Sequence, residues 1–199
     1  MHQGMPQNRE IVLASSSAYR KALIARLGVN CAVIAPDIDE DPLSGEAPVN
    51  TALRLAQAKA RRIAPQKPGA VIIGSDQVAV LGDRTLGKPG NHDAAVRQLR
   101  AMSGQSVIFH TALCVLDTES GKLQAGNVPT TVQFRELDTA QIERYLSIDQ
   151  PYDCAGSAKI EALGIALVER VESDDPTALI GLPLIALTGM LNQCGIRIP

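Results

Sequence analysis

The run AVIIG at residues 70–74 restricts the fold of this chain more than any other segment. It has no polar side chain and is rich in β-branched residues, which predicts a strand covered on both faces by other elements. Similar apolar runs lie at 11–14 and 30–36, and stretches with helical spacing lie at 18–27 and 49–64. This alternation of strands and helices predicts an α/β fold.

A predicted hairpin follows in the second half of the chain. Residues 105–116 and 123–137 are its two strands, joined by TESGK, so the sheet is expected to be mixed and flanked by helices. The other predicted elements are strands over 78–81 and 164–172 and helices over 91–102, 139–146 and 183–194. Because no long linker divides the chain, one domain is expected over 5–199. Whether Met1 or Met5 is the natural start stays open.

Composition excludes several classes of protein. The net charge is -2 and aromatic residues make up 3% of the chain, so a partner that is a nucleic-acid polymer is not expected. The longest apolar stretch, 179–191, is too short to cross a bilayer, and the first ten residues are unlike a signal peptide. The four cysteines are scattered, with no C-x-x-C motif. These features predict a cytoplasmic protein with reduced thiols and no membrane partner.

The segment GDRTLGKP at 82–89 comes close to the phosphate-binding loop G-x-x-x-x-G-K-[ST]. Pro89 stands where a hydroxyl residue would hold magnesium, and the segment follows a turn instead of a buried strand. We therefore do not expect a P-loop enzyme. Lys88 is still a candidate for contact with phosphate as a point charge. The alternative for Lys88 is an ordinary solvated loop lysine.

The segment SSS at 15–17 supplies a second candidate for phosphate binding. It lies at the start of the predicted helix 18–27, where unpaired backbone N–H groups favour anions. The hydroxyl of Ser15 and the guanidinium of Arg20 would add donors there. Simple capping of the helix by serine is the alternative.

Asp76 and Glu40 are the candidate carboxylates. Asp76 is predicted at the end of the strand 70–74, and Glu40 lies in an acidic loop after another strand. Ligands bind at such strand ends in α/β sheets, and magnesium typically takes one or two carboxylates together with phosphates and water. The alternative for the acidic loop is a solvated turn. Lys59 on the helix 49–64 and Glu161 in a Gly/Ser-rich loop are weak candidates when each is taken alone.

Taken together, several segments resemble the Maf family of nucleotide pyrophosphatases. They are LASSSAYRKALI at 13–24, PDIDE at 36–40, LAQAKA at 55–60, GSDQVAVL at 74–81, GKP at 87–89, SG at 103–104 and GLPL at 181–184. The resemblance implies an elongated, two-lobed fold with a central cleft, related to inosine-triphosphate pyrophosphatases. It also implies that a divalent cation, Mg²⁺ or Mn²⁺, assists hydrolysis of a nucleoside triphosphate to a monophosphate and pyrophosphate.

The resemblance further implies roles for individual residues. Asp76 would accept a proton from the attacking water and would hold the metal together with Glu40. The residues expected to contact phosphates or to build the cleft are Ser15, Arg20, Lys59 and Lys88. The residues expected to select the base are Tyr19, Gln77 and Glu161.

Two segments, GSDQ at 74–77 and CAGSAKIEALG at 154–164, resemble the branch of the family that acts on 7-methyl-GTP. Tyr19 would stack on the cationic base, and Glu161 would accept its hydrogens. Gln77 would offer a donor and an acceptor, or position Asp76. The expected products are 7-methyl-GMP and pyrophosphate, so a modified nucleotide is removed from the cellular pool. The alternatives are a dTTP/UTP pyrophosphatase and a non-enzymatic, nucleotide-binding regulator of cell division. Whether the chain forms a homodimer stays open.

Overall fold

The computed structural model describes residues 9–199, so residues 5–8 at the start of the expected domain lie outside the described part. The strands are β1 (Ile11–Ala14), β2 (Cys31–Ile34), β3 (Val71–Leu81), β4 (Arg84–Leu86), β5 (Ser106–Asp117), β6 (Leu123–Phe134) and β7 (Val168–Ser173). The α-helices are α1 (Ala18–Ala25), α2 (Pro48–Ile63), α3 (His92–Met102), α4 (Thr139–Asp149) and α5 (Leu184–Gln193). Short 3₁₀ turns are η1 (Ala64–Gln66), η2 (Ala155–Ser157), η3 (Leu163–Leu167) and η4 (Ala178–Ile180).

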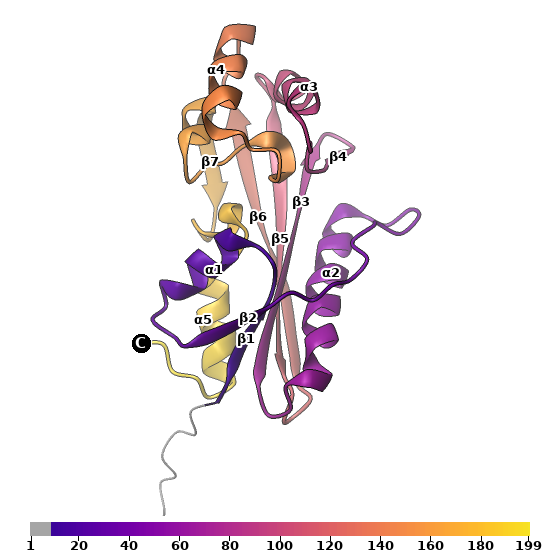
Figure 1. The fold of residues 1–199 in the computed structure, drawn as a ribbon, viewed down its shortest axis with the longest axis vertical. Coiled ribbons are helices and arrows are strands. Elements are labelled where there is room, and N and C mark those ends of the chain that lie inside the picture. The colour runs from indigo at the N-terminus through magenta and orange to yellow at the C-terminus, as the bar shows by residue number, and fades with distance from the viewer. Residues whose placement is uncertain (1–8) are drawn as a thin grey trace, which may run out of the picture.

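The described strands form one mixed sheet, as expected. Its order is β2-β1-β3-β5-β6-β7, and β4 pairs with β3. β1 lies parallel to both β2 and β3, whereas β3, β5 and β6 pair antiparallel. Figure 1 shows that these three long strands run through the whole elongated molecule. Strands β3, β5 and β6 therefore contribute to the sheet at both ends of the molecule.

The helices divide the molecule into two lobes (Figure 1). In one lobe α1 and α5 cover one face of the sheet and α2 covers the other; in the second lobe α3 and α4 cover the sheet. Side chains of β3 alternate between the two faces, with Val71 and Ile73 packed on the α5 side and Ile72 on the α2 side. The prediction that the run 70–74 is buried on both faces is confirmed. No helix in residues 9–199 is long and apolar enough to cross a membrane.

The expected break between two strands at residues 75–77 is wrong, because β3 continues through it to Leu81. Pairing with β1 ends where Ala14 faces Gly74, but the ladder with β5 continues, and Asp76 faces Ala112 in it. This antiparallel pairing keeps the polar residues extended. Asp76 is thus held in the middle of a strand, just beyond the end of the parallel pairing.

Candidate active site

A cavity of about 750 Å³ lies where the two lobes meet. Its walls come from the segment after β1, the loop after β2, α2, β3, the loop after β4 and the loops around 153–161 and 179–181. All nine residues singled out from the sequence line it: Ser15, Tyr19, Arg20, Glu40, Lys59, Asp76, Gln77, Lys88 and Glu161. Residues from remote parts of the chain therefore share one site.

Lys59 joins the two candidate carboxylates at the floor of this cavity. Its Nζ lies 2.6 Å from Asp76 Oδ1 and 2.7 Å from Glu40 Oε1. Lys59 is only 4% exposed, so it is not the surface lysine that its helix alone would suggest. A buried ammonium needs such partners, because an unpaired charge in the interior is costly. The cluster holds two carboxylates against one ammonium.

Glu40 is held in its charged form by its neighbours. Desolvation raises the pKa of this carboxyl, but the hydrogen bond from Lys59 and the charges of Lys59, Lys88 and Arg20 outweigh it and leave the pKa below its ordinary value. Glu40 therefore carries a full negative charge at neutral pH.

The chemistry of these donors fits a hard divalent cation. Asp76 and Glu40 each direct one oxygen at Lys59, so their second oxygens, Oδ2 and Oε2, remain without a hydrogen-bond partner among residues 9–199. No cluster of three His, Cys, Asp or Glu side chains occurs in the same residues. A site with two carboxylates suits magnesium or manganese, which would complete its shell with phosphate oxygens and water.

Ser15 and Arg20 lie where α1 begins. The helix is capped by Ser17, whose side chain accepts from Arg20 N, while Ser15 Oγ accepts from Ser17 N at 3.1 Å. Ser15 thus supports the cap and can still donate its hydroxyl proton. Arg20 Nε donates to Gly181 O at 2.8 Å, and the Nη groups make no hydrogen bond within residues 9–199. Those groups are available to an anion.

Burial of Arg20 disfavours the charged form of its guanidinium. Desolvation lowers the pKa of its guanidinium, and the carboxylates of Asp76 and Glu40 raise it in part. Lys88, by contrast, is an exposed residue on the loop after β4. Arg20 and Lys88 therefore supply positive charge to the cavity from two different sides, which suits a polyanion.

Gln77 differs from its expected role. Its Nε2 donates to Thr111 Oγ1 at 2.9 Å and to the carbonyl oxygens of Ala178 and Leu179 at 3.1 and 3.0 Å. Because backbone carbonyls only accept, these partners determine the orientation of the amide. The nitrogen is committed to holding η4, and only the carbonyl oxygen of Gln77 remains for a ligand.

Tyr19 on α1 and Glu161 in the loop before η3 also line the cavity. The hydroxyl of Tyr19 accepts a contact from the Cys154 thiol at 3.8 Å, and burial raises the pKa of Tyr19. Glu161 is exposed at the rim and makes no hydrogen bond within the described chain. Lys159 turns away, since its Nζ donates to Asp149 O at the end of α4. Asp153 and Glu161 of this loop line the cavity, whereas Lys159 does not.

Sequence reasoning missed the part played by Gly181 and Cys154. Gly181 has a φ of 117°, and its carbonyl oxygen accepts from both Arg20 Nε and Ser75 Oγ. The glycine in the segment GLPL was a signal for such a backbone site. Cys154 touches Tyr19, and no spacing pattern in the sequence marks it.

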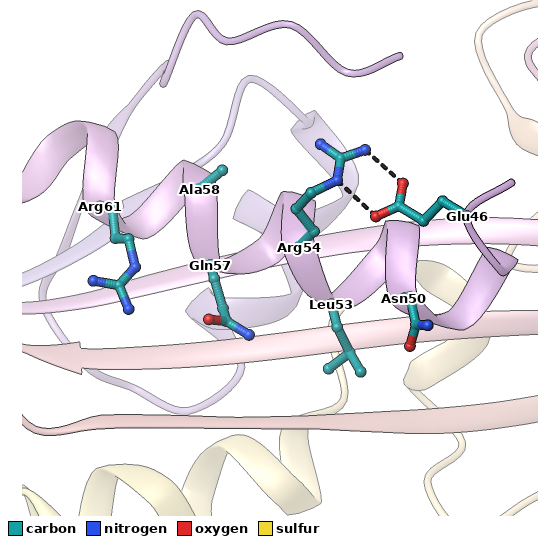
Figure 2. A pocket seen from close by; sticks show the side chains of 7 residues that line it. All are labelled: Glu46, Asn50, Leu53, Arg54, Gln57, Ala58 and Arg61. Atoms are coloured by element: carbon teal, nitrogen blue, oxygen red, sulfur yellow. Dashed lines mark hydrogen bonds and ion pairs between the residues drawn. The ribbon is translucent and has the colours of Figure 1, made fainter. Parts of the chain in front are cut away.

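A second hollow lies on the outer side of α2 and has a volume of about 560 Å³. Figure 2 shows its lining along the helix, with Arg54 held by two hydrogen bonds to Glu46. It contains none of the nine residues singled out from the sequence. The chemistry is thus concentrated in the cavity between the lobes.

Comparison with known proteins gives a consistent picture. The model of the family described as "Maf-like protein" matches residues 10–194. A protein of Cupriavidus metallidurans named 7-methyl-GTP pyrophosphatase is 56% identical over 185 residues, 93% of each chain. A protein of Methylobacillus flagellatus with the same name is 57% identical over 188 residues, 94% of this chain and 98% of the relative.

Among solved structures, a HAM1 protein from Coxiella burnetii has a similar fold. The TM-score is 0.53 at 17% sequence identity, and the match covers 93% of this chain and 99% of the other. At this level of identity the similarity concerns the fold alone. It agrees with the elongated two-lobed architecture expected from the sequence.

Proposed function

The chain belongs to the Maf family, and from this membership we propose that it hydrolyses 7-methyl-GTP to 7-methyl-GMP and pyrophosphate. The observation that carries the proposal is the cluster of Asp76, Glu40 and Lys59 in a cavity that Arg20 and Lys88 also line. It combines a hydrolytic carboxylate, candidate metal ligands and cations for a triphosphate. A cytoplasmic location stays a prediction from the sequence.

Each side chain has a task that follows from its position. Asp76 takes the proton of the water that attacks the α-phosphorus, because it is the buried carboxylate of the cluster. Lys59, Arg20 and Lys88 offset charge on the phosphates and on the leaving pyrophosphate. A divalent cation bound by Asp76 and Glu40 would add Lewis-acid stabilisation of the same charge.

Base selection rests on Tyr19, Glu161 and Gln77, which line the same cavity. Methylation at N7 makes guanine cationic, and such a ring gains from stacking on the face of Tyr19. Glu161 accepts the N1–H and amino hydrogens of guanine and opposes its charge. Uracil and thymine present one N–H between two carbonyl oxygens, which a carboxylate repels. Since the Gln77 nitrogen is already bound to η4, Gln77 contributes an acceptor only, which also favours guanine.

The products test the proposed reaction. With 7-methyl-GTP and Mg²⁺ or Mn²⁺, we expect one 7-methyl-GMP for each pyrophosphate, and no activity after the metal is removed by a chelator. Anion-exchange chromatography of the nucleotides, with a pyrophosphate assay, measures both. A diphosphate and orthophosphate as main products, or full activity in chelator, would contradict the proposal.

Glu161→Gln tests base selection. The loss of a charged hydrogen-bond partner is worth about 1.5–3 kcal/mol, and because Glu161 is exposed we expect the lower end. The rate with 7-methyl-GTP should fall about tenfold, and the gap to dTTP and UTP should narrow. Glu169→Gln, on the exposed side of β7 and away from the cavity, is the matched control. A silent Glu161→Gln substitution would mean that Glu161 only faces solvent.

A further inference from the structure

Two loops with different tasks meet beside the cavity. The loop after β4 carries Lys88, which faces the phosphates in the proposed function, and residues 152–161 carry Glu161, which faces the base. Their backbones are joined directly, since Gly90 N donates to Tyr152 O at 3.0 Å. Both loops lie at the end of the molecule that holds α3 and α4 (Figure 1). Their relative position therefore determines how far Lys88 stands from Glu161.

Gln98 on α3 connects the same two loops through its side chain. Its Nε2 donates to Gly87 O at 3.0 Å, and its Oε1 accepts from Ser157 Oγ at 2.5 Å. The carbonyl of Gly87 only accepts, so the amide has one orientation, with each end used once. Gly87 is next to Lys88 and itself lines the cavity. One side chain thus connects the loop after β4 that carries Lys88, here called the phosphate loop, to residues 152–161, here called the base loop.

Ser157 is held in an unusual conformation at its end of this bridge. It is fully buried, and its φ of 55° lies in the left-handed region, directly after Gly156 with a φ of 72°. A non-glycine residue there costs energy and persists only when its surroundings hold it in place. The bond to Gln98 is the hydrogen bond that the Ser157 hydroxyl donates. The shape of the base loop therefore depends on Gln98.

We propose that Gln98 is a positioning residue for substrate selection, which holds the base loop in register with the phosphate loop. The proposal rests on the proposed function, because it assigns the two loops to the two parts of a nucleotide. Gln98 itself lies outside the cavity lining and touches no reacting atom. Its effect is transmitted through Gly87 and Ser157. Breaking either end of the bridge should have the same consequence.

The test compares 7-methyl-GTP with GTP, which have the same triphosphate. A general structural loss lowers kcat/KM for both nucleotides by the same factor. A misplaced base loop instead lowers the ratio of kcat/KM for 7-methyl-GTP to kcat/KM for GTP. Gln98→Met keeps the length of the side chain but has no hydrogen-bonding amide, and Ser157→Ala removes the hydroxyl from the other end. Each should narrow the preference for 7-methyl-GTP about fivefold, the effect of one hydrogen bond. The double variant should narrow it no further, because the two ends act in series.

Gln124→Met is the matched control. Gln124 also bridges two elements, by donating to Met190 O and Cys194 Sγ, and none of these three residues lines the cavity. Its substrate ratio should equal that of the unmodified protein. An unchanged ratio in Gln98→Met would overturn the proposed role of Gln98 but not the proposed function. Effects of the two substitutions that multiply in the double variant would do the same. If Gln98→Met does not fold, Ser157→Ala decides, because it breaks the same bridge. A wild-type protein without preference for 7-methyl-GTP would overturn the proposed function as well.

Discussion

Asp76→Asn is expected to lower the turnover of 7-methyl-GTP by at least about a hundredfold, the usual scale for loss of a general base. The substitution keeps the shape of the side chain but removes the charge that takes a proton and attracts the metal. Steady-state kcat, measured by pyrophosphate release, checks it. The fold should be little changed, because Lys59 keeps its second partner, Glu40, at 2.7 Å.

Asp83→Asn is the control for this variant. Asp83 lies in the exposed turn between β3 and β4 and does not line the cavity. Its kcat should match that of the wild-type protein. Near-normal activity in a well-folded Asp76→Asn protein would remove Asp76 from the reaction and leave the cluster as a structural ion pair.

Gly74→Ala is expected to destabilise the fold by about 3 kcal/mol, at the upper end of the cost of overpacking. A Cβ at Gly74 would stand 2.0 Å from the backbone carbonyl oxygen of Ala56 in α2. Both the Cβ and the Ala56 carbonyl are fixed to backbone, and neither can move aside as the end of a flexible side chain would. The helix α2 and β3 must therefore separate. Since α2 carries Lys59 and β3 carries Asp76, the ion pair between them should weaken too. Denaturant unfolding monitored by circular dichroism measures the loss of stability.

Gly189→Ala provides the opposite result in the same assay. Gly189 lies within α5, and a Cβ there would meet nothing within 4 Å. Alanine is favoured over glycine in a helix by about 0.5–1 kcal/mol, so this variant should be more stable than the wild type. Equal stability of Gly74→Ala and wild type would contradict the close packing of α2 on β3.

The fold class could be predicted from the sequence because its signals are local. Apolar β-branched runs at 11–14 and 70–74 mark buried strands, as the structure confirms, and the side chains of Asn91 and Asp138 cap α3 and α4. Each of these features depends on neighbouring residues alone. The mixed sheet followed from the alternation of helices and strands and from the hairpin of β5 and β6.

The details of the site depend on contacts between remote segments, and these have no local signal. The polar residues at 75–77 suggested a break in β3, because pairing with β5 cannot be read from them. Lys59 is buried only because Glu40 and Asp76 reach it from two other segments. Besides the Thr111 hydroxyl, the Gln77 nitrogen binds two backbone carbonyls about a hundred residues away. Any residue type could supply those oxygens.

The initial rate of pyrophosphate release from 7-methyl-GTP, GTP, dTTP and UTP, measured on the wild-type protein at equal concentrations with Mg²⁺, tests the central claim most directly. The cationic base, the carboxylate of Glu161 and the acceptor of Gln77 predict that 7-methyl-GTP reacts fastest, GTP more slowly, and dTTP and UTP slowest. Binding of nucleotide without turnover would favour a regulator. Faster hydrolysis of dTTP or UTP than of 7-methyl-GTP would contradict the assignment of the substrate.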